Sequence, residues 1–172
     1  YFIAQGLGAN GLTALNLALP VFNFIHGIGL MLGMGGASKY SIYKSRGESK
    51  NADKYFLNTL ISGAIISIVI IFLGITVSKN VTHILGADEK TFDMTHIYLK
   101  MLMLFSPAFI FNNIFLCFIR NDNAPALSMT AMITGSLSNV VLDYLLNFPF
   151  SMGMFGAILS TCLSPVISLA IM

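Results

Sequence analysis

Residues 55–78 read YFLNTLISGAIISIVIIFLGITVS and contain no Asp, Glu, Lys or Arg. A helix rises about 1.5 Å per residue, so this stretch is long enough to cross the roughly 30 Å hydrocarbon layer of a bilayer. Its Ile and Val content does not favour a strand, because strands of this length are rare. The stretch therefore predicts a transmembrane helix.

The composition of the whole chain agrees with a membrane location. Of its 172 residues, 56% are hydrophobic and 9% are charged, whereas about 25% charged residues are usual in soluble domains. With so few charges, apolar side chains must face lipid, so the lipid bilayer is an expected partner. The nine basic residues form no strip interleaved with aromatic side chains, and we expect no nucleic acid as a partner.

Other apolar stretches have the length of a membrane crossing. The predicted spans are residues 12–38, 55–78, 94–118, 126–146 and 154–172. Residues 1–5 are predicted to be the end of a truncated helix 1, because Gly and Asn residues follow and break the apolar run. Pro107 is expected to bend the third span. The predicted fold class is all-α, a single polytopic membrane bundle over residues 1–172 with about five full spans.

Residues 27–36, GIGLMLGMGG, lie inside the first predicted span. A glycine-rich phosphate loop would need a preceding strand and a Lys, and this stretch has neither. Small residues allow membrane helices to approach each other closely, so we expect these glycines to pack against neighbouring helices.

The distribution of basic residues predicts an orientation. Residues 39–54 and the loop around Arg120 carry six Lys and Arg residues, and residues 79–93 and 147–153 carry two. Basic residues concentrate in cytoplasmic loops. We therefore expect a multi-pass protein of the plasma membrane with the loop 39–54 in the cytoplasm.

Asp143 places a carboxylate within the otherwise apolar span 126–146. An ionisable group near the bilayer centre costs at least about 2.5 kcal/mol, and such groups are usually functional; near the outer interface, where this span ends, it would instead be solvated. Asn139 lies four residues earlier on the same helical face and can donate a hydrogen bond to the carboxylate. A buried carboxylate of this kind can exchange H⁺ or Na⁺ with whichever side has water, as an ion-coupled carrier requires.

Other polar and sulfur-containing side chains are candidates for a substrate cavity. His26 lies inside the first span with Asn23 one turn before it, in either a functional role or an interhelical hydrogen bond. Met132 and other methionines have flexible side chains that can adapt to varied apolar ligands. His83 and His96 have no third ligand at a spacing that suits a metal. We expect no catalytic residues, no enzyme activity and no cofactor.

Five segments of the sequence are informative because of the order in which they occur along the chain. They are GLGANGLTALNLALPVFNFIHGIGLMLGMGGASKYS (6–41), LGADEKTF (85–92) followed by YLK (98–100), FIRNDNAP (118–125), SLSNVVLDYLL (136–146) and GMFGAILSTCLS (153–164). In this order they resemble the multidrug and toxic compound extrusion (MATE) transporter family, and most of all its bacterial branch. The resemblance covers nearly the whole chain.

The resemblance implies a role and a partner for this bundle. Family members have twelve helices in two bundles, so this chain resembles helices 2–6 of the N-terminal bundle, with the C-terminal bundle of the same parent chain as its partner. The family's cation site falls on Asp143, Asn139 and Thr161, and its helix 1 Asp would lie before Tyr1. The implied function is export of diverse, often cationic organic compounds in exchange for H⁺ or Na⁺, by rocking of two bundles around a cavity.

Three alternatives stay open from the sequence. A lipid-linked saccharide flippase of the same superfamily would favour cationic cavity residues, and the predicted spans contain no Arg. A membrane-embedded phosphotransferase or prenyltransferase would need clustered carboxylates for Mg²⁺, and the spans offer one Asp. A passive channel or structural subunit is excluded only weakly.

Overall fold

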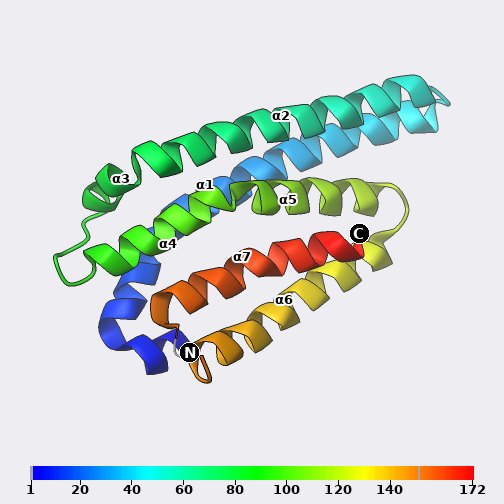
Figure 1. Ribbon diagram of the computed structural model, residues 1–172. Coiled ribbons are helices and arrows are strands. Elements are labelled where there is room, and N and C mark those ends of the chain that lie inside the picture. The colour runs from blue at the N-terminus through cyan, green and yellow to red at the C-terminus, as the bar shows by residue number, and fades with distance from the viewer. Residues whose placement is uncertain (1, 151) are drawn as a thin grey trace.

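A computed structural model describes residues 2–150 and 152–172 and places the described residues in seven helices. They are α1 (Phe2–Ser45), α2 (Ser49–Thr76), α3 (Ser78–Ile84), α4 (Phe92–Leu104), α5 (Ser106–Asn121), α6 (Pro125–Asn147) and α7 (Gly153–Ile171). The helices α1 and α2 form one long antiparallel hairpin, and α6 and α7 form another (Figure 1).

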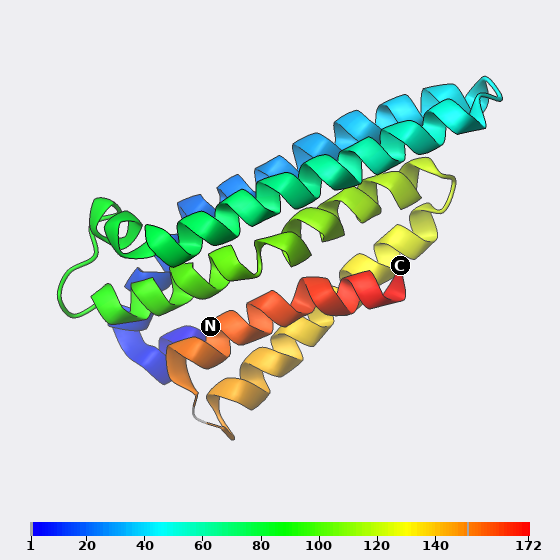
Figure 2. The ribbon, with the colours of Figure 1, turned by 45° about the horizontal axis from the view of Figure 1, so that its top comes forward.

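The α4–α5 segment lies between these two hairpins, as Figure 1 and the turned view in Figure 2 both show. The core forms where α4 and α5 meet α1 and α7. Its largest fully enclosed aliphatic side chains come from these four helices: Ile25, Leu99, Leu102, Ile110, Ile114 and Ile158. The chain therefore surrounds its central segment with helices on two sides.

Five stretches of the described chain can cross a membrane by length and composition. Four are single helical stretches, Gly8–Ser45, Ser49–Thr76, Pro125–Asn147 and Gly153–Ile171, and the fifth is the pair α4 and α5, bent by 50°. Large apolar side chains are exposed along α2 and α6, among them Ile61, Ile65, Ile68, Phe72, Leu137 and Val141. Exposed apolar surface of this extent marks a membrane or protein contact. The all-α, polytopic fold predicted from sequence is confirmed.

Two helix breaks have a clear local cause. The bend between α4 and α5 falls at Phe105, and Pro107 follows in the first turn of α5, where its missing N–H is tolerated. This agrees with the predicted bend of the third span. The kink in α1 falls at Gly8, whose φ of 66° is a conformation that glycine adopts without a side-chain clash.

The glycines of α1 allow close packing, as the sequence predicted, at three positions. A Cβ added to Gly29 would lie 3.0 Å from Asn113 Cβ, and one added to Gly33 would lie 3.0 Å from Cys117 Sγ. A Cβ on Gly36 would overlap Thr59 of α2. Gly27 and Gly35 have open space at the same point, so only one face of the glycine-rich stretch serves packing.

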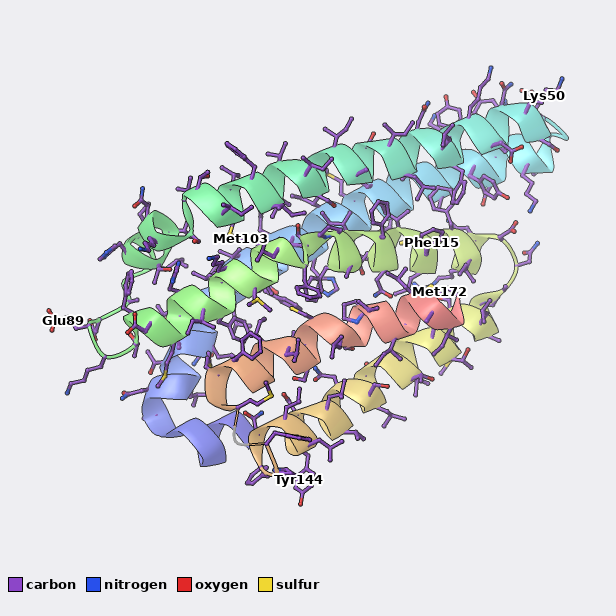
Figure 3. The ribbon with its side chains drawn as sticks, viewed as in Figure 1. Lys50, Glu89, Met103, Phe115, Tyr144 and Met172 are labelled. Atoms are coloured by element: carbon purple, nitrogen blue, oxygen red, sulfur yellow. The ribbon has the colours of Figure 1, made fainter. Side chains whose placement is uncertain are left out.

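The structure corrects the predicted polar loops. Residues 39–54 are mostly helical, because α1 continues to Ser45 and α2 begins at Ser49, which leaves residues 46–48 as the turn. Lys, Arg and Glu are good helix formers, so the charged residues extend the two helices beyond the apolar layer. The predicted loop 79–93 likewise contains most of α3. Lys50 and Glu89 mark these two regions at opposite ends of the molecule (Figure 3).

Candidate functional site: a carboxylate and a polar cavity

The facing sides of α6 and α7 are built from small residues. On α7 they recur every fourth position, at Gly156, Ser160, Ser164 and Ser168. A Cβ added to Gly135 of α6 would lie 3.1 Å from Ser168 Cβ, and the Ser164 hydroxyl donates to the Gly135 carbonyl at 2.7 Å. Because small residues every four positions line one face of a helix, the two backbones approach closely along their length.

This close approach places a hydroxyl against the one carboxylate of the hairpin. Asp143 lies one turn before the end of α6 and is half-buried, and Ser160 of α7 is fully buried. The Ser160 hydroxyl donates to Asp143 Oδ1, and it also lies 2.8 Å from the Ala157 carbonyl of its own helix. A hydroxyl has one proton and two acceptor lone pairs, so Ser160 can donate to either oxygen.

Of the other residues assigned to this site from sequence, Asn139 lies one turn before Asp143 on α6 and Thr161 follows Ser160 on α7. Asn139 and Thr161 both line a cavity of about 460 Å³ that also has lining residues from α1 and α5. The Thr161 hydroxyl donates to the Ala157 carbonyl of its own helix at 3.0 Å. Among the described residues no hydrogen bond joins Asn139 to Asp143, which accepts from Ser160 instead.

The cavity is lined by four helices and is polar on several sides. Two oxygen atoms of lining residues, Asn112 Oδ1 and Ser168 Oγ, are enclosed and have no hydrogen-bond partner within the described chain. Enclosed polar atoms are almost always hydrogen-bonded in proteins, so each exception requires an explanation such as a water molecule or an ion. Each of the two atoms can therefore accept a hydrogen bond from a water molecule or a polar ligand in the cavity.

Two of the three predicted cavity residues line this space. His26 and Met132 are lining residues, whereas Asn23 is exposed on α1 and is not one of them. His26 does not pair with Asn23: its Nδ1 contacts Asn113 Nδ2 of α5 at 2.6 Å. The interhelical hydrogen bond, one of the two roles left open by the sequence for His26, is present in the structure, and the cavity-lining position of His26 leaves the functional role open as well.

Sequence reasoning missed Ser160 and Asn113. The spacing of small residues on α7 was a usable signal for Ser160, because the stripe that contains Ser164 and Ser168 passes through residue 160. Asn113 had no such signal, since it is 87 residues from His26. Within residues 2–150 and 152–172, no group of three His, Cys, Asp or Glu side chains is arranged to hold a metal.

These features define a class: a multi-pass helical membrane protein with a partly open cavity, lined by polar and apolar residues, beside a half-buried carboxylate. The family model MatE matches residues 1–145. The chain is also 31% identical, over 170 residues, to the multidrug export protein MepA of Staphylococcus saprophyticus, which covers 98% of this chain and 37% of MepA.

Solved structures agree with the sequence comparison. A multidrug resistance MATE family transporter in its inward-facing conformation matches 99% of this chain with a TM-score of 0.93 and 26% identity, over 39% of its own length. An outward-facing structure of a MATE transporter matches 99% of this chain with a TM-score of 0.91 and 26% identity, over 38% of its length. The chain belongs to the MatE family, and it spans little more than a third of the length of these relatives.

Proposed function

We propose that this chain is the N-terminal bundle of a secondary antiporter that exports organic compounds, often cationic, in exchange for H⁺ or Na⁺. The observation that carries the proposal is the Asp143 carboxylate, which accepts a hydrogen bond from Ser160 beside a cavity with polar and apolar lining residues. The proposed ion-coupling residues are Asp143, Asn139 and Thr161, with Ser160 added from the structure. His26 and Met132 are proposed to contact substrate in the cavity.

The geometry of Ser160 suits a carboxylate that changes its charge. When Asp143 is ionised, Ser160 donates its proton to the carboxylate. When Asp143 takes up H⁺, the new carboxyl proton can be donated to Ser160 Oγ, and the Ser160 proton turns to the Ala157 carbonyl 2.8 Å away. Both charge states thus keep their hydrogen bonds, which avoids the cost of an enclosed polar group left unpaired.

The two conformations among the related structures support a rocking mechanism. This bundle superposes with TM-scores of 0.93 and 0.91 on inward-facing and outward-facing transporters. A good fit to both states agrees with a mechanism in which one bundle rocks against another. The coupling ion drives such a change only if it binds the two states with different affinity. The second unit would be a C-terminal bundle of the same parent chain.

We infer from the charge distribution that the turn at residues 46–48 faces the cytoplasm of a bacterial cell and that the α6–α7 turn faces outward. In that orientation the half-buried Asp143 is reached from the outside, one helical turn from the end of α6. A cysteine introduced at Arg46 should react with impermeant reagents from the cytoplasmic side alone. Reaction from the outside would reverse the orientation.

A vesicle flux assay tests the proposed activity. The two-bundle transporter that carries this chain is reconstituted, and uptake of the fluorescent cation ethidium is followed with an imposed H⁺ or Na⁺ gradient. We expect accumulation against the ethidium gradient that stops when an ionophore dissipates the ion gradient. Flux that only equilibrates ethidium, with or without the ionophore, would indicate a passive channel and contradict the proposal.

A further inference from the structure

The side chains of His26 on α1 and Asn113 on α5 are in close contact. Asn113 is 4% exposed, and its Nδ2 lies 3.1 Å from the Phe109 carbonyl of its own helix and 2.6 Å from His26 Nδ1. Gly29 allows this approach, since a Cβ at that position would lie 3.0 Å from Asn113 Cβ. The pair thus lies at a close contact between α1 and α5.

The Phe109 carbonyl determines which end of the Asn113 amide faces His26. A carbonyl can only accept a hydrogen bond, so the amide atom beside it must be the NH₂ group. The same NH₂ group contacts His26 Nδ1, which must therefore be an acceptor without a proton. The single proton of the neutral imidazole is then on Nε2.

Nε2 is the ring nitrogen of His26 that stays accessible. Within the described residues it has no hydrogen-bond partner, and it is not among the enclosed polar atoms, although His26 is a cavity-lining residue. The ring is held in place by edge contact with Phe22, at 4.9 Å between centroids, and by Phe109 at 6.1 Å. None of the lining residues is Asp, Glu, Lys or Arg, so no charged group of the lining would compensate an imidazolium.

We propose that Asn113 fixes His26 as an uncharged donor whose Nε2–H recognises a hydrogen-bond acceptor, such as a carbonyl oxygen, on the transported compound. In this role His26 selects substrates and does not carry the coupling ion, and Asn113 is its positioning residue. The inference rests on the proposed transport function. It assigns two tasks to different residues: Asp143 binds the ion, and His26 donates a hydrogen bond to the substrate.

Two probes that differ only in an acceptor test the selection. They are tetraphenylphosphonium and its derivative with one para-acetyl group, and their equilibrium binding to the solubilised two-bundle transporter is measured without any ion gradient. One neutral hydrogen bond should make the acetyl derivative bind about threefold to tenfold more tightly. Because no gradient is involved, a failure of ion coupling leaves this ratio measurable.

Two substitutions of His26 by residues of similar size distinguish the effect of its hydrogen-bond donor from the effect of its shape. His26→Gln places an amide NH₂ near the position of Nε2 and should keep the preference, whereas His26→Leu should bring the ratio to about one while tetraphenylphosphonium still binds. An unchanged ratio in His26→Leu overturns the proposal. Loss of the ratio in both variants, with both proteins folded, indicates a role that needs the imidazole itself and also overturns it.

Nitrogen NMR of the imidazoles tests Asn113 without any ligand. In the transporter labelled with ¹⁵N-histidine, the signal absent from His26→Gln should be a neutral ring with its proton on Nε2 at a pH of about 6 and of about 8. Asn113→Leu should add a population with the proton on Nδ1. A doubly protonated His26 near pH 6 contradicts the assignment. A tautomer population that is the same in the wild-type protein and in Asn113→Leu also contradicts it. Neither result depends on transport.

Discussion

Two helices of this chain, α2 of the first hairpin and α7 of the second, contain hydroxyl groups that form different kinds of hydrogen bond. On α2 the hydroxyls of Thr59 and Thr76 donate to carbonyls four residues earlier in their own helix, at 2.8 and 2.7 Å. On α7 the hydroxyls of Ser160 and Ser164 reach across to α6. A hydroxyl satisfied by its own helix leaves the neighbouring helix free of polar contacts, whereas one that crosses the interface fixes a group on its neighbour.

The two hairpins also differ in where their charged residues lie. Ile65, Ile68 and Phe72 of α2 are exposed and suited to lipid, and the charges of the α1–α2 hairpin lie near its tip. The α6–α7 hairpin has its carboxylate between the helices and contributes Asn139, Thr161 and Ser168 to the cavity. The first hairpin therefore has its charges away from the cavity, and the second is the proposed site of ion coupling.

The largest effect should come from neutralising the carboxylate of the second hairpin. Asp143→Asn keeps the size of the side chain but cannot bind H⁺ or Na⁺ by a change of charge, so ion-driven export should fall by about 100-fold or more. The matched change on the first hairpin, Asp53→Asn, should leave export within about twofold, because Asp53 is exposed near the α2 start. Flux in vesicles with equal amounts of each protein measures both.

Export at the wild-type rate by Asp143→Asn would contradict the proposal that the second hairpin, and not the first, couples the ion. Equal losses in both variants would contradict it as well, since a general effect of lost charge would then explain the result.

A smaller effect should follow from removing the cross-helix hydroxyl. Ser160→Ala takes away a hydrogen bond to a charged group, worth about 1.5–3 kcal/mol, so ion-driven export should fall by about tenfold. Thr76→Val removes a hydroxyl that bonds only its own helix and should change export less than twofold. The same flux assay compares them, and a larger loss in Thr76→Val would contradict the account.

The smallest effect concerns packing within the first hairpin. Gly36→Ala adds a Cβ that overlaps Thr59, and overpacking of this kind costs about 1–3 kcal/mol. Gly35→Ala adds its Cβ where nothing lies within 4 Å, so the thermal midpoint should stay the same or rise slightly. Thermal unfolding of the solubilised transporter distinguishes the two, and equal midpoints would show that the α1–α2 contact is not tight.

The fold was largely predictable because lipid demands long apolar helices. Residues 55–78 and 126–146 lie almost wholly within helices. Pro107 correctly predicted the bend between α4 and α5. The C-terminal end of α1 and the N-terminal end of α2 were predicted to be part of a polar loop. The charged residues there are also good helix formers, and they continue the two helices. Charge alone does not distinguish a turn from a helix that leaves the membrane.

The candidate site was predictable only where one residue stood out from its own segment. Asp143 did so, as a single carboxylate in an apolar span. Ser160 and Asn113 did not, because their roles depend on which face of α7 meets α6 and on how closely α1 approaches α5. Those contacts are set by tertiary packing between segments far apart in the chain, which the composition of a segment does not reveal.

Infrared difference spectroscopy of the carboxyl group is the most direct test of ion binding at Asp143. Spectra of the two-bundle transporter are recorded while H⁺ or Na⁺ is added, for the wild-type protein and for Asp143→Asn. A carboxyl signal that responds to one of these ions and is missing from the variant is the predicted result. A wild-type spectrum with no such signal, or the same signal in Asp143→Asn, would contradict the assignment.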